Sequence, residues 1–176
     1  NIIGTMDKIS SGVAIVDGVE LSNLTKNEAS DFRRDKIGFI FQSYNLIPVL
    51  TVYENVEFIL DLFEKISDKE KKIKINSLLE ELGLLEYKNR TPKELSGGQQ
   101  QRVAIARAIA NDASIIVADE PTGNLDKENE QKVMEYFQYL SSIGKSIVMV
   151  THNENLLEYS DKAFYLRNGK LEEFIL

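Results

Sequence analysis

The sequence contains no cysteine among its 176 residues, which excludes a disulfide framework and a thiolate metal site. It also lacks a basic excess, because 28 Asp and Glu outnumber 21 Lys and Arg and the formal net charge is −7. Nucleic-acid binding requires clustered Lys and Arg to neutralise phosphates, so this acidic balance argues against nucleic acid as the main partner. No apolar run approaches the roughly 18 residues that a membrane-spanning helix requires.

The composition that remains is that of a folded globular protein. Hydrophobic residues make up 43% of the chain and charged residues 28%, values that exclude wholesale disorder. A chain of this length forms about one domain, whose core buries roughly two-thirds of the unfolded surface. The sequence opens with Asn1-Ile2-Ile3-Gly4 and no initiator methionine. We therefore expect a fragment whose amino-terminal portion is missing.

Strand and helix patterns alternate along the chain. Apolar runs predict strands over residues 13–16, 36–42, 114–118 and 146–150, and a final hairpin over 163–166 and 171–174. Apolar residues at helical spacing predict helices over 52–63, 75–82, 98–111, 127–143 and 154–159. This alternation predicts an α/β fold with a largely parallel sheet. Residues 51–92 are helical throughout, so we expect a helical subdomain there, inserted into an α/β core built from residues 1–50 and 93–176.

Polar side chains follow three of the predicted strands directly: Gln42, the pair Asp119-Glu120, and His152. Because the carboxyl ends of parallel strands meet at one edge of a sheet, these side chains are expected to converge there. Asp119 suits Mg²⁺, and Glu120 is placed to deprotonate a water that attacks a phosphate. His152 is placed to hydrogen-bond that phosphate or the water. An arbitrary Asp-Glu pair, or a lone histidine, more often belongs to a loop or a solvated surface.

The segment Leu95-Ser96-Gly97-Gly98-Gln99 is the most specific motif in the chain. Ser96 and Gln99 have the spacing of a capping box at a helix start, and two glycines let a ligand approach the backbone closely. The N–H groups and the dipole of the helix then form an anion site. The alternative is an ordinary glycine-containing helix start, which residues 100–108, with the sequence QQRVAIARA, make hard to sustain.

With these residues the sequence resembles the ATP-binding-cassette (ABC) ATPases along most of its length. Residues 95–99 match the family signature, residues 115–120 the Walker B strand and its glutamate, and residues 123–126 the D-loop. Gln42 resembles the Q-loop glutamine and His152 the switch histidine. Residues 42–48 and 121–126 look most like the lipoprotein-releasing and macrolide-exporter branch. The P-loop motif G-x-x-x-x-G-K-[ST] is absent from the chain, as is the upstream aromatic residue that stacks on adenine, and residues 1–4 resemble the end of the helix that follows the P-loop.

The resemblance implies a P-loop NTPase-like fold that binds ATP and Mg²⁺. It assigns Glu120, His152 and Gln42 to catalysis, and Asp119 and Gln42 to Mg²⁺. Ser96, Gly97, Gly98, Gln99 and Asp126 are assigned to the nucleotide and the seam of a head-to-tail homodimer. Without the P-loop, the fragment is expected to bind ATP poorly and to be inactive alone.

The resemblance also implies a membrane partner. The helical subdomain is expected to dock on a transmembrane permease, with the protein cytoplasmic and peripheral on the inner face of the membrane. The implied function is that of the ATP-hydrolysing subunit of an ABC transporter for export or for lipoprotein or peptide-type substrates. Two alternatives are open: an ABC ATPase that transmits force or signal to a membrane partner without transport, and a soluble ABC ATPase acting on ribosomes or DNA.

Overall fold

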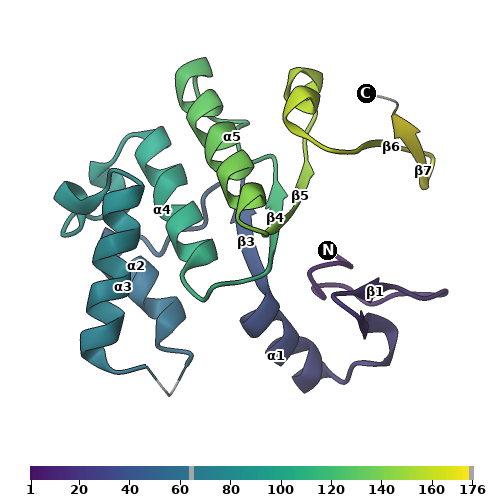
Figure 1. Cartoon of the computed structure of the whole chain (residues 1–176), viewed down its shortest axis with the longest axis horizontal. Coiled ribbons are helices and arrows are strands. Elements are labelled where there is room, and N and C mark those ends of the chain that lie inside the picture. Colours follow the sequence, from purple (N-terminus) through teal and green to yellow (C-terminus); the bar gives the residue numbers. More distant parts are fainter. Residues whose placement is uncertain (64–65, 175–176) are drawn as a thin grey trace.

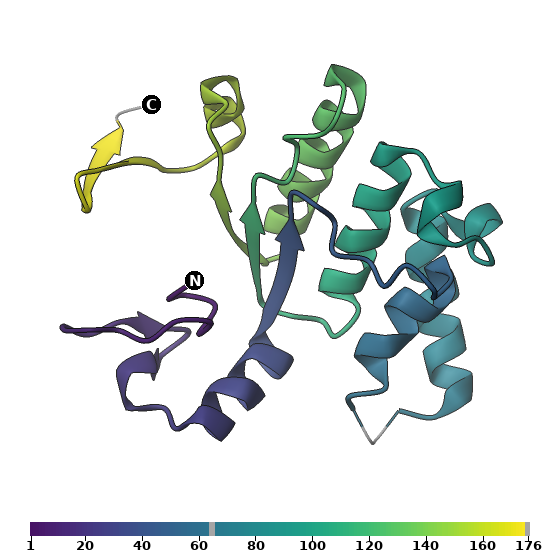
Figure 2. The same ribbon diagram turned by 180° about the vertical axis from the view of Figure 1, so that it is seen from behind.

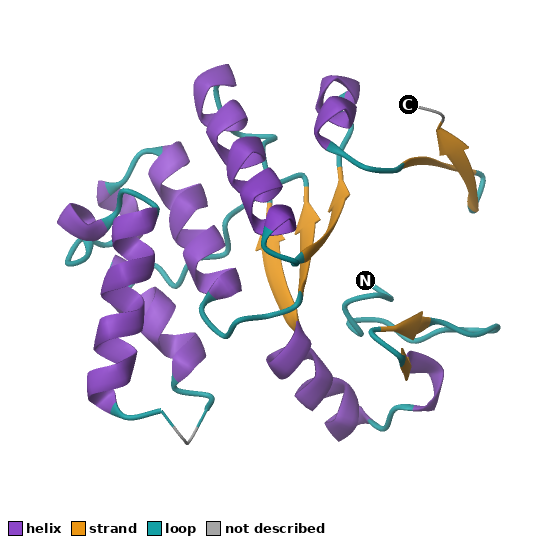
Figure 3. Ribbon diagram, viewed as in Figure 1, coloured by secondary structure: helices purple, strands orange, loops and turns teal. Residues whose placement is uncertain are grey.

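The computed structural model describes residues 1–63 and 66–174. A small parallel sheet occupies the middle of the molecule, with two long helices lying across one of its faces (Figures 1 and 2). A group of helices lies beside them, and two separate hairpins lie on the opposite side of the sheet (Figure 3). The architecture is therefore α/β, as the alternating pattern predicted.

The sheet consists of β3 (Ile37–Phe41), β4 (Ile115–Asp119) and β5 (Ser146–Val150), in the order β3-β4-β5 and all parallel. The helices on its face are α4 (Gly97–Ile109) and α5 (Lys127–Ser142). Sheet and helix approach most closely at Gly38, where a Cβ atom would lie 2.1 Å from the carbonyl oxygen of Ala108. The three predicted core strands and these two helices are confirmed to within about two residues.

The helical group comprises α2 (Val52–Leu60), α3 (Asp68–Glu81) and the short 3₁₀ helices η2 (Leu85–Tyr87) and η3 (Pro92–Glu94). Helices α2 and α3 each begin at a capping box, formed by Thr51 with Glu54 and by Ser67 with Glu70. One continuous cluster of buried apolar side chains joins this group to α4 and α5, with Val56, Leu79, Val103 and Phe137 among its members. The helical group thus shares its core with the rest of the chain, and a subdomain boundary at residues 51 and 92 stays a prediction.

The amino-terminal region contains a hairpin and a helix. Strands β1 (Ile15–Val16) and β2 (Val19–Glu20) are joined by Asp17-Gly18, both with positive φ, as in a type I′ turn. After the 3₁₀ helix η1 (Leu21–Asn23), helix α1 (Lys26–Lys36) begins at a Thr25–Glu28 capping box. The expected strand over 13–16 is shorter than predicted, and α1 was not predicted. Only Phe32 of α1 is buried, so the helix carries almost no apolar periodicity.

Residues 1–6 form a turn with the hydrogen bonds of a Schellman motif. The Met6 N–H donates to the Asn1 carbonyl and the Thr5 N–H to the Ile2 carbonyl, each with an N···O distance of 2.9 Å. Thr5 has a φ of 51°. This is the pattern with which helices commonly end.

The chain finishes with the 3₁₀ helix η4 (Glu154–Tyr159) and the hairpin of β6 (Ala163–Arg167) and β7 (Lys170–Phe174). Asn168 and Gly169, both with positive φ, make the predicted turn. In the described part of the chain, no helix combines the length and the apolar character of a membrane span.

The connection from β3 to α2 is held by Asn55, whose side chain is fully buried. Its Nδ2 group lies within hydrogen-bond distance of the Ile47 (3.2 Å), Leu50 (3.1 Å) and Thr51 (2.9 Å) carbonyls, and its Oδ1 accepts from the Ile47 N–H (2.8 Å). The Ile47 and Thr51 carbonyls also accept backbone N–H groups, but the Ile47 N–H and the Leu50 carbonyl find their partner in this one amide, where the loop turns into the helix.

We expect Asn55→Asp to lower the free energy of unfolding by about 3 kcal/mol, because a carboxylate cannot donate to these carbonyls and would be a buried charge. Urea unfolding followed by circular dichroism measures the change. Asn27→Asp is the matched control: Asn27 is exposed in the first turn of α1, and its change should stay within about 0.5 kcal/mol. Equal effects of the two substitutions would contradict the stabilising role of Asn55.

Candidate functional site

The carboxyl ends of the three parallel strands carry the polar residues that the sequence singled out. Phe41 of β3 pairs in register with Asp119 of β4, which in turn pairs with Val150 of β5. Gln42, Glu120 and the Thr151-His152 pair follow directly after these positions. The predicted convergence of Gln42, Asp119, Glu120 and His152 at one sheet edge is therefore what the structure has.

Glu120 is the most constrained residue at this edge. Its φ is 47°, in the left-handed region that is costly for a residue with a side chain. Its N–H donates to the Val150 carbonyl, with an N···O distance of 2.9 Å. The side chain is 18% exposed, and within the described part of the chain its buried Oε1 accepts no hydrogen bond. His152 Nε2 lies 3.4 Å from this oxygen, while the His152 side chain is almost fully exposed. Glu120 thus carries a buried acceptor oxygen beside His152 that receives no hydrogen bond from the described residues.

The loop after β4 packs on Gln42. The Gly123 N–H donates to the Glu120 carbonyl (3.1 Å), and Asn124 Nδ2 donates to the Gln42 carbonyl (3.0 Å). A Cβ atom on Gly123 would lie 2.7 Å from Gln42 Nε2, so the Gln42 amide lies directly over this glycine. The contact between Asn124 and Gln42 could not be predicted from the sequence, because nothing local connects residues so far apart in the chain.

Ser96 and Gln99 begin α4 as the predicted capping box. The Gln99 N–H donates to Ser96 Oγ (3.3 Å), and the Ser96 N–H donates to Gln99 Oε1 (2.8 Å). Gly97 and Gly98 lie in the first helical turn, whose N–H groups have no acceptor inside the helix. The start of α4 therefore has the backbone geometry of an anion site.

Asp126 begins α5 and is tied to Asn129. It accepts hydrogen bonds from the Asn129 backbone N–H (2.8 Å) and side-chain amide (2.9 and 3.0 Å), which lower the pKa of Asp126. The Asn129 amide also lies against the start of α4, because a Cβ atom on Gly98 would be 2.3 Å from Asn129 Oδ1. Asn129 therefore connects Asp126 to the Ser96–Gln99 segment. Asn129 was not predicted as a site residue, although its position three residues after the N-cap Asp126 was an available signal.

The site offers two oxygen donors for a hard cation. In the described residues, no group of three or more His, Asp or Glu side chains is arranged to hold a metal ion. The exposed Asp119 carboxylate and the Gln42 amide oxygen belong to the same edge, and this donor chemistry fits Mg²⁺ when phosphate and water complete the coordination. Mg²⁺ binding by Asp119 and Gln42 stays a prediction.

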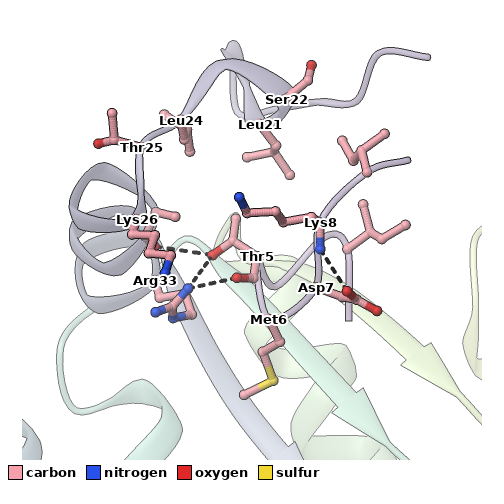
Figure 4. Close-up of a pocket in the computed structure, with 13 residues that line it drawn as sticks. Thr5, Met6, Asp7, Lys8, Leu21, Ser22, Leu24, Thr25, Lys26 and Arg33 are labelled. Atoms are coloured by element: carbon pink, nitrogen blue, oxygen red, sulfur yellow. Dashed lines mark hydrogen bonds between the residues drawn. The ribbon is translucent and has the colours of Figure 1, made fainter. Parts of the chain in front are cut away.

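Two cavities lie away from the sheet edge. One, of about 360 Å³, lies between the amino-terminal turn and α1, where Arg33 Nη1 donates to the carbonyl (2.7 Å) and hydroxyl (3.0 Å) oxygens of Thr5 (Figure 4). A second, of about 370 Å³, lies between α1, β3 and the end of α2. None of the predicted site residues lines either cavity. At the sheet edge, Gln42, Asp119 and His152 are exposed on this chain.

A parallel sheet with carboxylates at its carboxyl edge, next to a capped glycine-containing helix start, defines the class of α/β nucleotide-binding proteins. The family described as ABC transporter matches residues 1–123, and the chain belongs to the ATP-binding proteins of this family. The resemblance read from the sequence motifs is thereby confirmed.

Similar proteins and similar solved structures also belong to the ABC transporter ATP-binding proteins. An uncharacterized ABC transporter ATP-binding protein of Thermotoga maritima is 43% identical over 172 residues, covering 98% of this chain and 73% of its own length. The macrolide export ATP-binding/permease protein MacB of Mannheimia succiniciproducens is 43% identical over 97% of this chain and 26% of its own length.

Two of the similar solved structures are dimers of the bacterial ABC transporter cassette MJ0796. One superposes with a TM-score of 0.88 at 42% identity, covering 98% of this chain and 76% of the other. The other, a post-hydrolysis state bound to ADP and Pi, gives a TM-score of 0.87 at 40% identity, with 98% and 78% covered. The P-loop NTPase-like fold is thus confirmed.

Proposed function

We propose that the protein is the ATP-hydrolysing subunit of an ABC transporter that works through a membrane permease, in export or in the handling of lipoprotein or peptide-type substrates. The observation that carries this proposal is Glu120, whose buried carboxylate oxygen accepts no hydrogen bond within the described residues and lies at one sheet edge with Gln42, Asp119 and His152. Phosphate release from ATP by the purified full-length protein tests it. A folded protein that binds ATP without releasing phosphate would contradict the hydrolytic role.

In the proposed hydrolysis of ATP, each residue of the sheet edge has a separate role. Glu120 orients the attacking water through its carboxylate and takes up the proton of that water. His152, next to that oxygen and open to solvent, donates to the terminal phosphate. The Asp119 carboxylate and Gln42 amide hold Mg²⁺, which when bound neutralises phosphate charge.

The exposed sheet edge supports a site completed by a second copy of the chain. In this proposal Ser96, Gly97, Gly98 and Gln99 of one copy face the nucleotide on the sheet edge of the other, and Asp126 lies at the seam. Two observations support a homodimer: the Gly97 and Gly98 N–H groups in the first turn of α4 have no acceptor within the helix, and the related cassette MJ0796 forms dimers.

The helical group is proposed to dock on the permease, which would place the protein at the inner face of the membrane on the cytoplasmic side. Two large apolar residues support this assignment: Val49, in the loop just before the group, is 80% exposed, and Phe58, on α2, is 48% exposed. The related protein MacB is named as a macrolide export ATP-binding/permease protein.

We expect these 176 residues by themselves to bind Mg-ATP too weakly for a saturable titration, because they contain no P-loop to cradle the β- and γ-phosphates. A fluorescent ATP analogue titrated into the isolated chain measures the affinity. The full-length protein is the positive control, and circular dichroism of the isolated chain shows whether it is folded. Micromolar binding by the isolated, folded chain would overturn this expectation.

A further inference from the structure

The loop of residues 43–50, which joins Gln42 to α2, contains two consecutive residues in a costly backbone conformation. Tyr44 has a φ of 60° and Asn45 a φ of 48°, and neither is glycine. Such left-handed residues persist only where surrounding contacts hold them. The contacts that hold this pair therefore determine the path of the chain immediately after Gln42.

Arg107 of α4 supplies those contacts. Its Nη1 donates to the Asn45 carbonyl, and its Nη2 donates to the Tyr44 carbonyl with an N···O distance of 3.0 Å. The planar guanidinium therefore bridges both left-handed residues. Burial of the guanidinium lowers the pKa of Arg107. In the part of the chain that the structure describes, no carboxylate lies within ion-pair distance of it. The charge of Arg107 is thus directed at the loop.

The same loop touches the start of α4 and the helical group. The Tyr44 hydroxyl lies 3.0 Å from the position of a Cβ atom on Gly97. At the other end of the loop, the buried Asn55 holds the Ile47 and Leu50 backbone. The loop is therefore attached to α4 at its first turn and again near its last turn, and to α2.

We propose that Arg107 is a positioning residue that couples the two nucleotide sites of a dimer. This inference rests on the proposed function, in which Gln42 faces the nucleotide of its own chain while Ser96–Gln99 of the same chain faces the nucleotide of the partner. Through their contacts, Arg107 and Tyr44 fix the orientation of the Ser96–Gln99 segment relative to Gln42 of the same chain. Nucleotide at the Gln42 edge then sets the orientation in which the start of α4 is presented to the second copy.

The test separates nucleotide binding from dimerisation in the full-length protein. In a Glu120→Gln background that retains ATP, adding Arg107→Gln is expected to leave the affinity of a dilute monomer for a fluorescent ATP analogue within about threefold, and to weaken Mg-ATP-dependent dimerisation roughly tenfold. Analytical ultracentrifugation measures the dimer. Arg107→Lys should give an intermediate dimerisation constant, because an ammonium group lacks the planar fork that reaches both carbonyls.

Arg90→Gln is the matched control, since Arg90 is exposed outside the loop and its side chain stacks on Tyr87; it should change neither constant. Unchanged dimerisation by folded Arg107→Gln or Arg107→Lys protein would overturn the inference, as would a parallel loss of binding and dimerisation. If Arg107→Gln does not fold, the Lys variant alone decides. Failure of the Glu120→Gln protein itself to dimerise in Mg-ATP would instead count against the proposed function.

Discussion

Replacing Glu120 with glutamine is expected to lower the steady-state ATP turnover of the full-length protein by roughly 10²–10⁴-fold. The amide has nearly the shape of the carboxylate but cannot take up a proton from the attacking water. The backbone of Glu120 is held by its N–H bond to Val150 and by the Gly123 N–H on its carbonyl, so the substitution should not disturb the sheet edge. Phosphate release at saturating Mg-ATP measures the effect.

ATP-bound dimers should accumulate in the Glu120→Gln protein, because the step that dissolves them is blocked. Glu135→Gln provides the matched control: Glu135 is exposed on α5, where its carboxylate accepts from Gln131, and its turnover should stay within about twofold of the natural protein. Unchanged turnover in Glu120→Gln would refute the assignment of Glu120 as the general base.

Gly98→Asp is expected to abolish ATP-driven dimerisation of the full-length protein. The new carboxylate would repel the phosphates of the nucleotide that the start of α4 faces in the proposed dimer. The new Cβ atom would also lie 2.3 Å from Asn129 Oδ1. The Asn129 amide cannot move freely, because it donates to both carboxylate oxygens of Asp126. The substitution therefore disturbs two of the segments assigned to the dimer seam.

Size-exclusion chromatography in Mg-ATP measures the dimer, and titration of a fluorescent ATP analogue checks that each monomer still binds nucleotide. Gly98→Ala separates the two causes, since alanine introduces the collision with Asn129 without the charge; a partial loss of dimer is expected. A normal dimer yield from Gly98→Asp would show that this segment does not face the nucleotide.

Elements with strong local signals were predictable from the sequence. Apolar runs predicted strands over 36–42, 114–118 and 146–150, and β3, β4 and β5 lie within one residue of these bounds. The Thr51–Glu54 and Ser96–Gln99 spacings predicted helix starts that the structure has. Helix α1 was missed because it is largely exposed, which removes the apolar period, although its Thr25–Glu28 capping box was present in the sequence.

By itself, the sequence determined the fold class, the strands that carry Gln42, Asp119, Glu120 and His152, and the segment that begins α4, because each depends on neighbours within a few residues. Only the tertiary structure showed that Glu120 is left-handed with its N–H bonded to the Val150 carbonyl, and that Arg107 bridges Tyr44 and Asn45. These contacts join residues tens of positions apart in the chain, where local propensity and spacing carry no information and packing alone decides which groups meet.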